Sequence, residues 1–98
     1  MSITFAGFLA TLDAERPPEG LSAPLRALWL DRKGDWHGAH AIAQEIASAD
    51  GARIHAYLHR KEGDLSNAHY WYHQAGAPPA SGSSESEWEA LARRFAEP

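Results

Sequence analysis

Residues 56–76 read AYLHRKEGDLSNAHYWYHQAG, and this stretch contains a helix end, a turn and a helix start in that order. Gly63 can adopt the left-handed backbone conformation that often ends a helix. Asp64 follows it and can accept hydrogen bonds from the free N–H groups that open the next helix. The stretch therefore predicts two helices joined by a tight turn.

An earlier part of the chain, residues 27–46, is similar to residues 56–75 at an offset of 29 residues. The matched positions are Ala27 with Ala56, Gly34-Asp35 with Gly63-Asp64, and Ala39-His40 with Ala68-His69. A period between about 20 and 50 residues built from helix pairs is typical of helical repeat proteins. The sequence therefore predicts two helical hairpins, residues 22–48 and 51–76.

Further helices are expected on both sides of the two hairpins. Apolar residues between Ile3 and Leu12 predict a short helix that ends before Pro17-Pro18. Residues 77–86 are rich in Pro, Gly and Ser and predict a mobile loop, and residues 86–96 predict a C-terminal helix. We expect one all-α domain, residues 1–98, with five or six antiparallel helices.

Capping residues predict where these helices begin and end. Ser22 is expected to cap the second helix, and Asp35 a third helix from Trp36 to about Ser48. Asp50-Gly51 is expected to break the chain before the fourth helix. Ser84 or Ser86 is expected to cap the C-terminal helix, whose apolar stripe is Trp88, Leu91, Ala92 and Phe95.

The composition limits the partners and the compartment. Thirteen acidic and nine basic residues give a net charge of −4, so the chain has no broad positive field for nucleic acid. The absence of cysteine excludes disulfides and thiolate chemistry and fits a reducing compartment. No apolar run approaches the roughly 20 residues of a membrane span. We therefore expect a cytoplasmic protein that binds neither nucleic acid nor membrane.

The second hairpin carries a family resemblance. Ala68, Tyr72 and Ala75 form the pattern A-x3-Y-x2-A, and residues 71–75 read WYHQA. These residues resemble the tetratricopeptide repeat and its shorter Sel-like relatives, and the chain as a whole resembles small bacterial proteins. The resemblance implies a non-catalytic module that binds a protein or peptide on the inner face formed by the first helix of each pair. It implies no cofactor.

Carried onto this sequence, the resemblance places Leu28, Asp31 and Arg32 of the first copy and Arg53, Tyr57, Arg60 and Lys61 of the second on that inner face. Arg53, Arg60 and Lys61 could hold an acidic group through charge-assisted hydrogen bonds. Tyr70 is expected to emerge from its helix as an aromatic contact. The predicted binding residues are thus Arg53, Tyr57, Arg60, Lys61 and Tyr70; the alternative is a solvated helix face.

The histidines support a second hypothesis, a metal site. His55 and His59 are four residues apart, as are His69 and His73, so each pair lies on one helix face. An antiparallel hairpin would bring the two pairs together, with Glu62 or Asp64 as a further ligand and a hydrolase as the enzymatic form of this alternative. No H-E-x-x-H motif is present. The other interpretation is that His55 and His59 pack between helices while His69 and His73 lie partly in water.

Overall fold

The computed structural model describes residues 3–97, which fold into helices without a β-strand. The helices are α1 Phe5–Thr11, α2 Ala23–Arg32, α3 Trp36–Glu45, α4 Ala49–Glu62, α5 Leu65–Ala75 and α6 Ser84–Phe95. The predicted all-α class is confirmed. No helix in residues 3–97 combines the length and the apolar character that a bilayer span requires.

Two turns with the same backbone geometry connect α2 to α3 and α4 to α5. Gly34 and Gly63 have φ angles of 93° and 94°, in the left-handed region that favours glycine. The hydrogen bonds repeat 29 residues apart: Asp35 N–H to Leu30 O at 2.8 Å with Asp64 N–H to His59 O at 2.9 Å, and Gly38 N–H to Asp35 Oδ1 at 2.9 Å with Asn67 N–H to Asp64 Oδ1 at 3.3 Å. The predicted turn at Gly63-Asp64 and its match at Gly34-Asp35 are therefore present.

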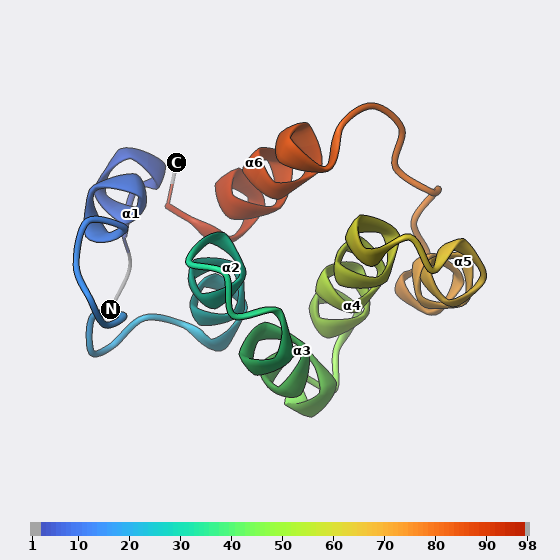
Figure 1. Cartoon of the computed structure of the whole chain (residues 1–98), viewed down its shortest axis with the longest axis horizontal. Coiled ribbons are helices and arrows are strands. Elements are labelled where there is room, and N and C mark those ends of the chain that lie inside the picture. Colours follow the sequence, from blue (N-terminus) through green and yellow to red (C-terminus); the bar gives the residue numbers. More distant parts are fainter. Residues whose placement is uncertain (1–2, 98) are drawn as a thin grey trace.

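The helices pack as neighbours in the chain, with α6 added across them (Figure 1). α2 packs on α3, α4 packs on α5, and α3 contacts α4. α6 returns to contact α2 and α4, while α1 and α5 lie at opposite ends of the molecule. The two ends of the described chain meet, because the Glu97 N–H donates to the Ile3 carbonyl at 2.7 Å.

Tryptophan side chains tie the terminal helices to the core. Trp88 of α6 is buried, stacks on Phe8 of α1 with ring centres 5.8 Å apart, and donates its Nε1–H to Leu28 O at 3.0 Å. Leu91 and Ala92 are also buried, so the predicted apolar stripe of α6 faces the core. A buried indole gains most when its N–H also has a partner, as it has here.

The break between α3 and α4 lies earlier than predicted. α3 ends at Glu45 and not near Ser48, and Asp50-Gly51 lies in the first turn of α4 and does not interrupt it. Gly51 is required for a different reason: a Cβ atom there would lie 2.8 Å from Cβ of Ile46 and closer still to the Ile46 carbonyl oxygen. The glycine permits a close approach of backbone to backbone, so it does not mark a helix end.

The start of α6 also differs from the prediction. Ser83 is the N-cap, and its Oγ accepts from the Ser86 N–H at 3.0 Å, whereas Ser84 and Ser86 both lie inside the helix. The loop predicted over residues 77–86 is therefore shorter, because Ser84 already begins the helix. Several serines in succession offered equivalent caps, and the sequence could not choose among them.

Candidate functional site

The inner face predicted from the sequence is formed by α2 and α4, and α6 covers it. The Arg32 guanidinium lies 3.8 Å from the ring centre of Trp88 and 3.1 Å from Glu85 Oε2. Trp88 also bonds to the Leu28 carbonyl on the same helix, at 3.0 Å. The chain's own C-terminal helix therefore occupies this face.

A buried carboxylate, Asp31, organises one part of this contact. Its Oδ2 accepts from the Tyr57 hydroxyl at 2.5 Å, and its Oδ1 accepts from Lys61 Nζ at 2.9 Å. Burial, followed by the hydrogen bond to Asp31, raises the pKa of the Tyr57 hydroxyl, so this group stays protonated and donates. Tyr57 was predicted to line an exposed binding face, but it is only 2% exposed, because its hydroxyl belongs to the shell of Asp31.

A second buried carboxylate, Glu87 of α6, has the same type of environment. It accepts from Arg60 Nη1 at 3.0 Å and from the Tyr72 hydroxyl at 2.6 Å, and Arg60 also donates to the Gly82 carbonyl. Burial, followed by the hydrogen bond to Glu87, raises the pKa of Tyr72. Arg60 and Lys61, both predicted to hold an acidic partner, thus already hold Glu87 and Asp31 of their own chain.

The other two predicted binding residues lie apart from this contact. Arg53 is half-buried, and its Nε has no hydrogen-bond partner among the described residues. Tyr70 is 54% exposed and packs edge-on against Trp71, with ring centres 5.1 Å apart. Among the five predicted residues, Tyr70 is the one whose exposure agrees with a role as a surface contact.

Three histidines converge on the other side of α4. His40 comes from α3, and His55 and His59 come from successive turns of α4. One ligand nitrogen from each lies within 4.8 Å of the others, and the Nε2 atoms of His40 and His55 are 2.9 Å apart. His55 and His59 are buried and His40 is half-buried. We refer to these three residues as the histidine cluster.

Two tryptophans orient the histidine cluster. The ring of Trp36 is stacked on His40 with centres 4.9 Å apart, and its Nε1–H donates to Leu58 O at 2.9 Å. The ring of Trp71 is stacked on His55 with centres 3.9 Å apart. The α3–α4 packing therefore fixes His40 opposite His55, and α5 supplies the ring that covers His55.

Burial and a carboxylate set the protonation of the cluster. Burial, with smaller contributions from His40 and His59, lowers the pKa of His55 to about 4. The pKa of His40 is also lowered, first by burial and then by His59. Nδ1 of His59 is 2.7 Å from Glu62 Oε2, and a carboxylate can only accept, so Nδ1 carries the proton and Nε2 keeps its lone pair. Near neutral pH, His40 and His55 are uncharged imidazoles.

The structure regroups the histidines proposed from the sequence. His55 and His59 lie together as predicted, but His69 and His73 are exposed on α5 and are not part of the cluster. His40, which the sequence hypothesis omitted, takes their place from α3. Glu62 and Asp64 form a further group with His59 whose ligand atoms lie within 4.8 Å, so a carboxylate next to His59 is present as considered.

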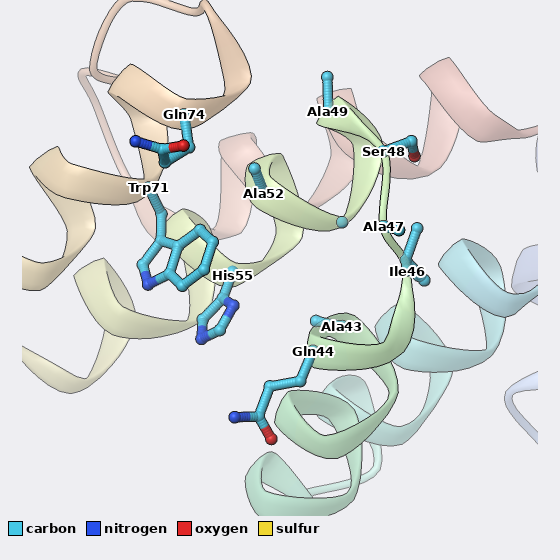
Figure 2. A pocket seen from close by; sticks show the side chains of 11 residues that line it. Ala43, Gln44, Ile46, Ala47, Ser48, Ala49, Ala52, His55, Trp71 and Gln74 are labelled. Carbon is cyan, nitrogen blue, oxygen red and sulfur yellow. The ribbon is translucent and has the colours of Figure 1, made fainter.

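A cavity of about 320 Å³ opens beside His55 (Figure 2). It lies between the end of α3 and its connection to α4 on one side and α5 on the other, with α4 beneath. Gln44, Ser48, His55, Trp71 and Gln74 are among its lining residues. The cavity therefore shares His55 and its stacking partner Trp71 with the histidine cluster.

Comparison with known proteins yields no match to a family model, to a curated protein or to a solved structure. The fold and the site define the class: an all-α protein with three histidines gathered between α3 and α4 and with α6 laid over α2 and α4. The function follows from the chemistry of these residues.

Proposed function

We propose that the protein binds a divalent transition-metal ion through His40, His55 and His59. The observation that carries this proposal is the convergence of three ligand nitrogens within 4.8 Å. Zinc–nitrogen bonds of about 2.0–2.1 Å place two nitrogens of a tetrahedral site roughly 3.4 Å apart. The His40–His55 separation of 2.9 Å is close to this value, so binding needs only small movements of the rings.

The surroundings fit an imidazole-bound ion. Imidazole nitrogen suits zinc, copper and nickel, and a ligand histidine usually donates its other N–H to a carboxylate or carbonyl. Glu62 accepts from Nδ1 of His59 in this way, which directs Nε2 toward the ion. Three protein ligands leave a fourth position open, in contrast to the closed four-ligand sites of structural zinc.

Metal binding can be tested by thermal unfolding and by equilibrium dialysis of the chelator-treated protein with zinc or nickel. We expect about one ion per chain. At a free metal concentration 100 times Kd, the free energy of unfolding rises by about 2.7 kcal/mol. For a domain of this size, each kcal/mol raises Tm by roughly 4–8 °C, so the expected shift is at least about 10 °C.

Histidine variants give a matched control for this experiment. His40→Ala removes one ligand and should abolish the Tm shift, and His55→Gln should do the same with a smaller change in packing. The double variant His69→Ala with His73→Ala removes an exposed pair and should keep both the shift and the stoichiometry. Equal binding by wild type and His40→Ala, or loss of binding in the His69 and His73 variant alone, would contradict the proposal.

We propose a second, non-catalytic function, that of a tetratricopeptide-like module that docks a partner helix. Its support is the way α6 is held: Arg32 and Arg60 pair with Glu85 and Glu87, and Trp88 lies buried beside them. The partner would be an amphipathic helix with an acidic first turn followed by an aromatic residue, which takes the place of α6 on α2 and α4. Neither proposal includes a catalysed reaction.

The docking proposal is tested with a labelled peptide that has the sequence of residues 81–97. In the full chain, Trp88→Ala weakens the contacts of the resident α6, so this variant should bind the peptide more tightly than wild type does. Adding Arg60→Glu should abolish that binding through repulsion from the peptide's glutamates, while circular dichroism verifies that each variant is helical. A peptide that binds none of the folded variants rules this function out.

A further inference from the structure

The position of the cavity relative to the histidine cluster is the observation of interest. The cavity wall includes Gln44, one helical turn after His40 in α3, and Ala52, about one turn before His55 in α4. The cavity therefore continues from the cluster along both helices. At the other end of the cluster, Trp36 is stacked on His40 and Glu62 bonds His59, so those sides are already occupied.

The lining of the cavity restricts what it can hold. No aspartate, glutamate, lysine or arginine is among its lining residues. Gln44, Gln74 and Ser48 supply uncharged polar groups, alanines supply small apolar surface, and Trp71 supplies a flat ring (Figure 2). A volume of about 320 Å³ is at the lower end of the range for small-molecule sites, about 300–1,000 Å³.

We infer that an ion held by His40, His55 and His59 keeps one coordination position for an exogenous ligand, and that the body of this ligand occupies the cavity beside His55. The ligand class is a small molecule with one nitrogen or oxygen donor and a flat, uncharged, mainly apolar body. This inference rests on the proposed metal site and adds what the site binds. The shared residue His55 connects the two, because its ring both faces His40 and lines the cavity.

The experiment uses the full chain loaded with Co²⁺, whose visible absorption reports the ligands of the ion. Two probes are titrated: imidazole, which has a donor and no body, and 4-phenylimidazole, which adds a flat apolar ring. Both should change the absorption bands. The phenyl ring should bury apolar surface in the cavity and make 4-phenylimidazole bind at least about tenfold more tightly.

Two neighbouring exposed positions on α3 provide the control. Gln44→Trp places a large side chain in the cavity and should reduce the affinity for 4-phenylimidazole at least about tenfold, with a much smaller effect on imidazole. Glu45→Trp adds the same side chain at a residue that does not line the cavity, and it should leave both affinities unchanged.

The outcomes separate this inference from the metal site itself. A cobalt spectrum that responds to neither probe contradicts the inference and leaves metal binding in place. Equal affinities for the two probes, or equal effects of Gln44→Trp and Glu45→Trp, contradict the role of the cavity. If the protein binds no cobalt at all, the metal site is wrong and the inference is wrong with it.

Discussion

The ion pair between Arg60 and Glu87 tests how α6 is held on the rest of the fold. The two side chains are 19% and 8% exposed, with Nη1 and Oε1 3.0 Å apart. Arg93 and Glu89 of α6 make the same type of pair at 3.2 Å, but they are 60% and 56% exposed. Hydrogen bonds to buried charged groups contribute about 1.5–3 kcal/mol, whereas exposed helix pairs contribute roughly 0.3–0.5 kcal/mol. We expect coupling energies of about 2 and about 0.4 kcal/mol for the two pairs.

The coupling is measured by double-mutant cycles in which both members of each pair are changed to alanine, singly and together. Urea unfolding followed by tryptophan fluorescence and circular dichroism gives the free energies, provided that the slope with urea is unchanged. Glu87→Ala alone should cost about 3–4 kcal/mol, because it also leaves the buried Tyr72 hydroxyl without an acceptor. A coupling energy for Arg60 and Glu87 no larger than that for Arg93 and Glu89 refutes the conclusion that burial makes this pair strong.

Three further predictions concern other parts of the fold. Because the pKa of His55 is lowered from 6.5 to about 4, the unfolded state binds more protons between these values, so the metal-free protein should lose stability as the pH falls through this range; the loss from pH 7 to pH 5.5 is about 1 kcal/mol, and urea unfolding of His55→Gln should show a flatter pH dependence. Gly51→Ala should cost about 1–3 kcal/mol in the same assay, because its Cβ would lie 2.8 Å from Cβ of Ile46; a variant as stable as wild type contradicts the close approach. Trp36→Phe keeps an aromatic ring beside His40 but loses the hydrogen bond to Leu58 O, so it should cost about 1 kcal/mol while zinc binding by dialysis is retained.

Local chemistry explains which parts of the fold were predictable. A turn at Gly63-Asp64 depends only on a residue that tolerates a positive φ and on a side chain that caps the next helix, and both are visible in the sequence. The same holds for Gly34-Asp35 and for the cap at Ser22, whose Oγ accepts from the Leu25 N–H at 3.4 Å. The apolar stripe of α6 was predictable for the same reason, since helical periodicity is a property of a single segment.

The histidine cluster depends on how helix pairs meet, which the sequence did not specify. His40 and His69 are equivalent at the offset of 29 residues, and the metal hypothesis used His69 because it lies in the same hairpin as His55 and His59. In the fold, α4 packs against the side of α3 that carries His40. α6 packs on α2 and α4 and does not continue the series after α5, so His69 stays exposed. The repeat offset contained the signal, but only the inter-pair contact gives it meaning.

The two candidate sites lie on nearly opposite sides of α4, because residues two positions apart in a helix are about 200° apart around its axis. Tyr57 and Lys61 face Asp31 of α2, whereas His55 and His59 lie with His40 of α3. On the first side α6 fills the space, and the charged groups there are already paired with Asp31 and Glu87. On the second side a cavity and three imidazole nitrogens remain. A ligand site needs both space and donor atoms, so the histidine side of α4 is the better candidate, even though the resemblance to helical repeats favours the other.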